Sequence, residues 1–277
     1  MGATEFDPVR DLELALCLTP GLGGAGITRI LTRNAVGGLS PAEFLSLSPK
    51  VLKEEYGLST RSAQALTDGA AGVRDEVLRF KKQSHAKPVR LVTLQSSVYP
   101  KRLEAFCKDP PGYLFLYGNM GVLSTRTFCV LASRDAGEDD LEQVERAVEK
   151  GVLEPRTLVT GANTAAYKRA AVVPLRWGAP RILVLDRGLF AALGEDLANE
   201  PFAAARLWRY RFDPETDLAV SACRPFDAYM PGHNWQRDEL VVALSDEVRV
   251  IRARPGGNVE RLARQAEEAG RSVARDG

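Results

Sequence analysis

The stretch that decides the fold reads Asp109-Pro110-Pro111-Gly112-Tyr113-Leu114-Phe115-Leu116-Tyr117-Gly118-Asn119. Its prolines and first glycine predict a sharp corner. The following run, Tyr113 to Tyr117, is short and fully apolar, which is typical of a strand buried on both faces. A second informative stretch, Tyr99-Pro100-Lys101-Arg102-Leu103, lies just upstream. Together they mark the start of a region built from buried strands.

Beyond residue 89, short apolar runs alternate with amphipathic stretches. The alternation predicts a doubly wound, mainly parallel sheet with helices on both faces, an α/β fold. The expected strands are residues 89–94, 113–117, 128–132, 157–160, 182–185, 218–221 and 247–251. The expected helices are residues 139–150, 163–175, 236–244 and 258–269.

Residues 10–83 read instead as a small helical domain. Ser40-Pro41-Ala42-Glu43 has the pattern of a capping box at a helix start. Pro20-Gly21-Leu22-Gly23 resembles the turn of a helix-hairpin-helix, whose glycines serve either packing or contact with a DNA phosphate. The polar stretch Lys81 to Pro88 then predicts a boundary, giving domains 1–83 and 84–277.

Composition narrows the class of function. The 277 residues carry a formal net charge of +1, so any nucleic-acid binding must come from a local patch. Four cysteines without a CxxC pair and two isolated histidines argue against a zinc site, and we expect no metal or other cofactor. There is no signal-peptide pattern and no apolar run of membrane-spanning length, which favours a cytoplasmic protein without membrane contact.

The two opening stretches resemble the entry to the Rossmann-like domain of the DNA-processing protein DprA (Smf) family. In that family a YPxxL turn leads to a helix, a D-P-P corner, an apolar strand and a Gly-Asn. The resemblance extends from about Leu12 to Val273. It implies an extended Rossmann-like domain after a helix-hairpin-helix or SAM-like one. It also implies single-stranded DNA binding, delivery of DNA to a recombinase in recombination, DNA uptake or competence, a homodimer, and no catalysis.

The family's signature loops survive in part. Val130-Leu131-Ala132-Ser133-Arg134 resembles V-G-S-R, with Ala132 in place of the glycine. The resemblance implies that Arg134 meets a phosphate beside Ser133. An arginine after a strand is alternatively a solvated loop residue.

The stretch Thr160 to Ala171 stands where the family has S-G-x-A-x-G-I-D-x-x-A-H. Gly161 is retained, and the second glycine, the aspartate and the histidine are replaced by Ala165, Tyr167 and Ala171. Gly161 could open a phosphate-facing turn at a helix N-terminus. The neighbouring cations, Lys168 and Arg169, either add charge to that site or are simply solvated.

The family's basic F-P-x-R-N-R motif is the most altered. Here the triplet reads Arg237-Asp238-Glu239, a formal change of three charges that predicts weaker binding of phosphate. Trp235, two residues upstream, either stacks on a base or packs against the protein.

Arg254-Pro255-Gly256-Gly257-Asn258 replaces the family's S-G-S-L turn at a helix N-terminus. It also resembles the phosphate loop of LOG-type phosphoribohydrolases, P-G-G-x-G-T-x-x-E, but lacks that loop's Gly-Thr and has Ala263 in place of the glutamate. This argues against nucleoside hydrolysis and leaves phosphate binding open. We therefore expect a bound anion where Ser133, Gly161 and Gly256 converge.

One more motif has two interpretations. Trp208-Arg209-Tyr210-Arg211 combines rings and cations as proteins that stack bases do, but aromatics at i and i+2 favour a half-buried strand.

For the whole chain, two functions stay open. One is a single-stranded DNA-binding recombinase mediator. The other is a diverged paralogue with weakened DNA binding that acts through protein partners or a nucleotide ligand.

Overall fold

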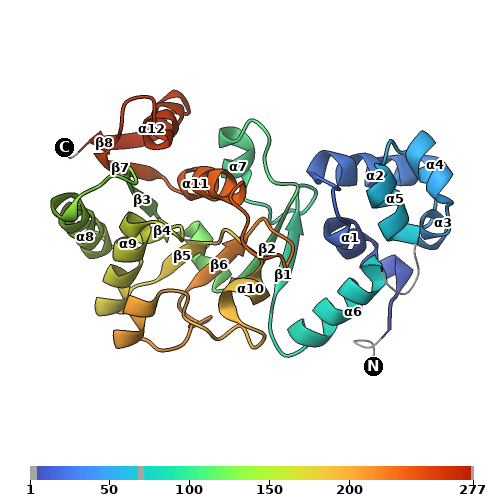
Figure 1. Cartoon of the computed structure of the whole chain (residues 1–277), viewed down its shortest axis with the longest axis horizontal. Helices are drawn as coiled ribbons and strands as arrows, with labels where there is room; N and C mark the ends of the chain where they lie inside the picture. Colours follow the sequence, from blue (N-terminus) through green and yellow to red (C-terminus); the bar gives the residue numbers. More distant parts are fainter. Residues whose placement is uncertain (1–4, 68–71, 276–277) are drawn as a thin grey trace. The chain divides into compact units, whose positions relative to one another are not determined.

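A computed structural model of the chain describes residues 5–67 and 72–275. The chain divides into two compact units, drawn in Figure 1. The first holds the residues up to Tyr99 together with Pro111–Leu114, and the second holds the remainder. The domain boundary expected at residues 83–84 stays a prediction.

The first unit is mainly helical. Residues Leu16, Ile30, Phe44 and Val77 are fully buried in its core. The predicted capping box is confirmed, because Glu43 accepts the N–H of Ser40 at 2.8 Å and donates its own N–H to the Ser40 hydroxyl at 3.3 Å. The elements are α1 (Pro8–Leu18), α2 (Gly24–Gly37), α3 (Pro41–Leu45), α4 (Pro49–Glu54), α5 (Thr60–Thr67), α6 (Val73–Ser84) and β1 (Arg90–Thr93).

The turn between α1 and α2 is used for packing. Gly21 has φ +76°, which suits a glycine. At the start of α2, a Cβ on Gly24 would lie 2.2 Å from the Cα of Gly112, so two backbones touch where any side chain would clash. This contact supports the packing interpretation of the hairpin glycines.

The second unit is built on the predicted sheet. The strands are β2 (Tyr113–Gly118), β3 (Thr127–Ala132), β4 (Thr157–Thr160), β5 (Arg181–Val184), β6 (Leu218–Ser221), β7 (Glu247–Arg252) and β8 (Ser272–Arg275). Within this unit the strand order is β2-β6-β5-β4-β3-β7-β8. The pairs from β6 to β8 are parallel and β2 runs antiparallel to β6.

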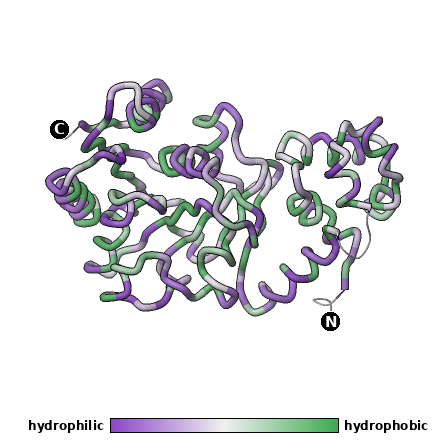
Figure 2. The backbone as a smooth tube through the Cα atoms, viewed as in Figure 1, coloured by the Kyte–Doolittle hydropathy of each residue, from purple (hydrophilic) through white to green (hydrophobic). Residues whose placement is uncertain are grey.

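Helices cover both faces of this sheet. Figure 1 shows α8 (Glu138–Leu153) and α9 (Ala165–Arg176) over one face, and α7 (Lys101–Phe106), α11 (His233–Ala243) and α12 (Asn258–Glu268) over the other. Phe128, Val144, Val148 and Val173 are fully buried between the sheet and α8 and α9. In Figure 2 the strands are mostly hydrophobic and α12 is mostly hydrophilic. The predicted Rossmann-like, doubly wound α/β fold is confirmed.

The prediction of a strand at Trp208–Arg211 is wrong. The segment follows a 3-10 helix, η2 (Ala203–Leu207), and forms only an isolated bridge between Arg211 and Asn199. No neighbouring strand covers the rings, and 46% of Trp208 and 75% of Tyr210 are exposed. Two further short elements are η1 (Met120–Ser124) and α10 (Leu189–Leu193).

Candidate nucleic-acid interface

The carboxyl ends of the parallel strands open into a cleft of about 700 Å³. This is the edge at which open α/β sheets bind ligands. The loop after β3, the first turns of α9 and α11, and the β7–α12 loop contribute its walls. Leu131, Ala132, Pro231, Val259 and Leu262 give it an apolar lining. Its polar lining comes from Ser133, Arg134, Asp135, Thr164, Tyr167, Asn234, Asp238, Arg254 and Asn258, with Trp235 and Gly257 completing the set.

Two exposed arginines stand at this cleft. Arg134 follows β3 and Arg254 follows β7, a directly paired neighbour in the sheet. Ser133 ties the two loops together, because its hydroxyl accepts the N–H of Arg254 at 2.9 Å and its own N–H donates to the Arg252 carbonyl at 2.9 Å. Within residues 5–67 and 72–275, neither Arg134 nor Arg254 forms an ion pair. Both positive charges are therefore available to a ligand.

Trp235 offers an aromatic surface in the same cleft. Its side chain projects from the first turn of α11 and is 53% exposed. The guanidinium carbon of Arg261 lies 5.3 Å from the ring centroid, so one face of the indole is held by a cation from α12. The ring is thus restrained while much of its surface stays open.

One of the two acidic residues that line the cleft, Asp238, is neutralised within the protein. It accepts hydrogen bonds from the Tyr167 hydroxyl at 3.0 Å, from Arg237 at 2.6 and 3.0 Å, and from the Asn258 amide at 2.9 Å. Burial, followed by the charge of Asp238, raises the pKa of Tyr167 well above its ordinary value, so Tyr167 keeps its proton and acts as a donor. Asp238 therefore opposes phosphate less than an unpaired carboxylate would.

Arg237 lies behind the wall of the cleft. Its side chain is 1% exposed and pairs with Asp238 and, at 3.6 Å, with Asp186. It also donates to the Asn234 amide oxygen at 2.9 Å and to the carbonyl of Ala162. All its polar groups act within the protein, which makes it a positioning residue for Asp238 and Asn234.

Gly161 is buried against the side chains of Arg237 and Tyr167. A Cβ there would lie 2.8 Å from the Tyr167 ring and 2.9 Å from Cδ of Arg237. The retained glycine thus allows Arg237 and Tyr167 to approach the end of β4.

The two predicted site cations on α9, Lys168 and Arg169, differ from each other. Lys168 is exposed but does not line the cleft. Arg169 pairs with Glu138 and, at 2.6 Å, with Glu145 on α8, and the hydrogen bond to Glu145 raises the pKa of Arg169. Its charge is thus largely used to join two helices.

The glycine turn before α12 holds a carboxylate of the protein itself. Gly256 has φ +68° and donates its N–H to Glu260 at 2.6 Å. Gly257 is the N-cap of α12, and Asn258 bonds Asp238. Of the predicted site residues, the cleft gathers Ser133, Arg134, Trp235, Gly257 and Asn258, whereas Gly161, Lys168, Arg169, Arg237 and Gly256 do not line it.

Sequence reasoning missed Tyr167, Asn234 and Arg254 as parts of this site. Arg254 had a usable signal, because it follows β7 as Arg134 follows β3. The third residue of the altered triplet, Glu239, is 6% exposed and does not line the cleft. Burial raises the pKa of Glu239, and its hydrogen bond with Gln265 of α12 opposes that shift.

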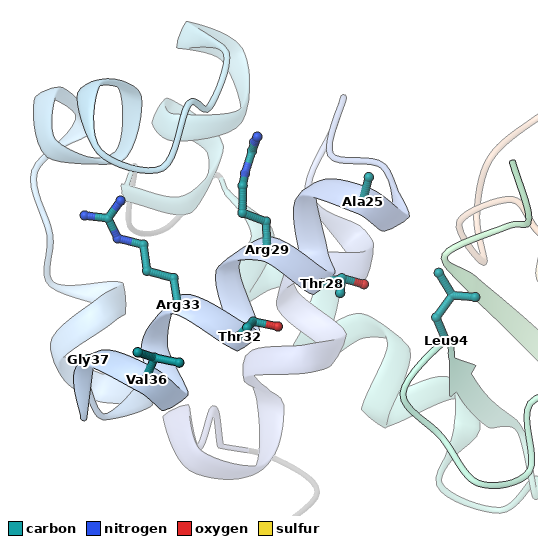
Figure 3. Close-up of a pocket in the computed structure, with 8 residues that line it drawn as sticks. All are labelled: Ala25, Thr28, Arg29, Thr32, Arg33, Val36, Gly37 and Leu94. Atoms are coloured by element: carbon teal, nitrogen blue, oxygen red, sulfur yellow. The ribbon is translucent and has the colours of Figure 1, made fainter.

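A second hollow, of about 770 Å³, lies within the first unit along α2 (Figure 3). Ala25, Thr28, Thr32, Val36 and Leu94 make its lining largely apolar. It contains none of the predicted site residues. Among the described residues there is no group of three or more side chains suited to a metal ion, and no helix there is long and apolar enough to cross a membrane.

The fold and cleft define a Rossmann-like binding protein with cations and an aromatic ring at the carboxyl edge of its sheet. Residues 90–275 match the family described as DNA recombination-mediator protein A. Because this match covers more than half of the chain, the protein belongs to that family and its role lies in DNA processing. The resemblance to DprA proteins is thereby confirmed.

Solved structures agree with this assignment at the level of the fold. The DNA processing protein A (DprA) of Streptococcus pneumoniae is 20% identical, with a TM-score of 0.69 over 98% of this chain and 87% of that one. DprA from Helicobacter pylori, described for its single-stranded DNA binding mode, is 18% identical, with a TM-score of 0.51 over 68% of this chain and 81% of that one. No curated protein matches the chain.

Proposed function

We propose that this protein binds single-stranded DNA in the cleft and acts as a non-catalytic mediator that delivers DNA to a recombinase. The observation that carries the proposal is the pair Arg134 and Arg254 beside Trp235, in a member of the DNA recombination-mediator family. Arginines neutralise backbone phosphates and an exposed ring stacks on a base, which is how single strands are bound without strong sequence preference.

Each group has its own part in the proposed complex. Arg134 and Arg254 meet successive phosphates, and the apolar lining with Trp235 receives an unstacked base. Ser133, Gly257 and Asn258 shape the wall. Arg237, Gly161 and Gly256 support that wall from behind, Lys168 adds positive charge at a distance, and Arg169 holds α9 against α8.

Family membership supports the wider setting of this proposal. We place the protein in recombination, DNA uptake and competence, as a cytoplasmic homodimer with a separate helical N-terminal domain. The description of the Helicobacter pylori relative as binding single-stranded DNA supports the choice of ligand.

The test is titration with a labelled single-stranded oligonucleotide at two salt concentrations. The parent should bind, and Arg134→Ala and Arg254→Ala should each weaken binding and flatten the dependence of log K on log salt by about 0.7. Arg146→Ala is the matched control, since Arg146 is an exposed arginine of α8 that does not line the cleft and pairs with Glu142. Unchanged affinity and slope in both cleft variants, with the fold intact, would exclude the cleft as the DNA site. A parent that binds no oligonucleotide at low salt would favour the diverged-paralogue function.

A further inference from the structure

Arg261 contacts the aromatic ring of the cleft without lining the cleft itself. It is an exposed residue of α12, and its guanidinium carbon lies 5.3 Å from the Trp235 ring centroid. Helices α11 and α12 pack against each other, which brings the two side chains together. Among the aromatic side chains, the indole of tryptophan attracts a cation most strongly. The contact therefore restrains the ring from the side of α12.

Two side-chain amides fix the plane of this guanidinium. Arg261 donates to the amide oxygen of Asn258 at 3.0 Å and to that of Gln265 at 3.1 Å. Both amides are on α12, three residues before and four residues after Arg261, where side chains on a helix surface meet. Because the guanidinium is planar and rigid, two fixed N–H groups set the orientation of the face that covers the indole.

Each of the two amides is in turn oriented by a second hydrogen bond. The amide nitrogen of Asn258 donates to Asp238 at 2.9 Å, and that of Gln265 donates to the carbonyl of Phe106 at 3.0 Å. Since both nitrogens are held by acceptors, both amide oxygens face Arg261. A series of hydrogen bonds thus leads from Asp238 to the guanidinium that covers the indole.

Charge neutralisation does not account for the position of Arg261. Among the residues that the structure describes, no carboxylate pairs with it. The carboxylate of the adjacent Glu260 accepts the N–H of Gly256 at 2.6 Å instead. An arginine that bonds only neutral amides and stacks on a ring serves the orientation of that ring.

We propose that Arg261 is a positioning residue of the DNA site, which holds Trp235 in the orientation in which a base stacks on the indole. This inference rests on the proposed function, since the ring acts only when a single strand enters the cleft. A ring that is restrained before binding loses less entropy when a base covers it. Because Arg261 does not line the cleft, its effect on affinity passes through Trp235 and not through a phosphate.

A double-mutant cycle with labelled oligo-dT tests whether Arg261 acts through the ring. Arg261→Ala should lower the affinity about 3- to 10-fold and leave the slope of log K against log salt unchanged, because no phosphate contact is lost. In a Trp235→Ala background the same change should have no further effect. The control is Arg264→Ala, which should match the parent, since Arg264 is an exposed arginine of α12 that pairs with Glu260 at 4.0 Å.

Tryptophan fluorescence tests the positioning in the absence of DNA. The chain has three tryptophans, so Trp177→Phe with Trp208→Phe leaves Trp235 as the only one. In that background Arg261→Ala should increase the quenching of its emission by acrylamide, because the indole loses the side chain that covers it. Asn258→Ala should increase the quenching less, because one of the two amides that hold the guanidinium remains. The control variant should leave it unchanged.

The possible results separate this inference from the proposed function. Equal losses of affinity on Arg261→Ala with and without the indole, or parental quenching in the single-tryptophan protein, would overturn the inference. A flatter salt dependence would make Arg261 a phosphate contact and would overturn it as well. All three results leave the proposed function standing. A parent that binds no oligo-dT would overturn the proposed function and, with it, the role assigned to Arg261.

Discussion

For Arg237, the family resemblance and the structure indicate different roles. The resemblance places this arginine next to DNA, whereas the structure encloses it between Asp238, Asp186, Asn234 and the Ala162 carbonyl. The informative change is Arg237→Met, because methionine fills much of the volume and removes the charge. The cost then comes from lost polar contacts more than from a cavity.

The magnitude follows from the burial of these groups. Asp186 is 1% exposed; Arg187 binds its Oδ1 at 2.9 Å, whereas its Oδ2 has no hydrogen-bond partner and faces Arg237 at 3.6 Å. Removing one member of a buried ion pair typically costs about 3–5 kcal/mol. Because Arg187 would still pair with Asp186, we expect the lower end of this range, which for a domain of this size corresponds to a fall of about 6–12 °C in Tm.

The assay is thermal unfolding followed by circular dichroism, with Arg134→Met as the matched control. Arg134 is exposed and forms no ion pair with the described residues, so its replacement should change the free energy of unfolding by less than about 0.5 kcal/mol. Suppose Arg237→Met keeps the parental Tm but loses affinity for single-stranded DNA. The arginine would then act on the ligand directly, and the reasoning from burial would be refuted.

Two further predictions concern the domain boundary and the altered triplet. Limited proteolysis should cut first between Lys81 and Lys87, and a first cut inside α11 would contradict that boundary. Burial raises the pKa of Glu239, so the fold disfavours its carboxylate and the stability of the parent falls as pH rises from about 4.5 through that raised pKa. Glu239→Gln should therefore have a higher Tm than the parent at neutral pH, with an advantage that shrinks as pH falls towards about 4.5. A Tm difference that stays constant over this range would argue against it.

The strands of the sheet could be predicted because they are short and apolar on both faces. Runs such as Phe128 to Ala132 and Ile182 to Leu185 lack the polar positions that would give an amphipathic helix pattern. Strands β3 and β5 begin and end within a residue or two of the expected bounds. The edge strand β8 gave no such signal, since Ser272–Arg275 is only partly buried and carries a terminal arginine. At Trp208–Arg211, alternation suggested a strand, but Arg209 is held by Asp217 and the rings remain in solvent.

From the sequence, only the site residues that directly follow a strand could be predicted. Ser133 and Arg134 follow β3, and Gly257 and Asn258 follow β7, so parallel pairing of these strands brings them together. Which arginines face solvent was not visible in the sequence. Arg134 and Arg237 are both arginines of family motifs that the resemblance places at the DNA, yet Arg237 is 1% exposed and Arg134 is exposed. The difference arises from partners at long sequence separation, such as Asp186 and Ala162.

The same long-range pairing changes the meaning of the departures from the family pattern. Read position by position, Tyr167 in place of an aspartate and Asp238 in place of an asparagine are two independent losses. In the structure they form one unit, because the Tyr167 hydroxyl donates to Asp238 and Arg237 lies over the Tyr167 ring at 5.1 Å.

Asp238, the acid that stands on α11 in place of the family's asparagine, thus receives a hydrogen bond from Tyr167, which stands on α9 in place of the family's aspartate. Restoring the family's Arg-Asn-Arg order would break this unit and, at Glu239, place an arginine in a buried site beside α12. The altered triplet is therefore better understood as a repacked wall of the cleft than as a set of charges facing the ligand. In the proposed complex, affinity for DNA would then depend on Arg134, Arg254 and Trp235, which are exposed at the cleft.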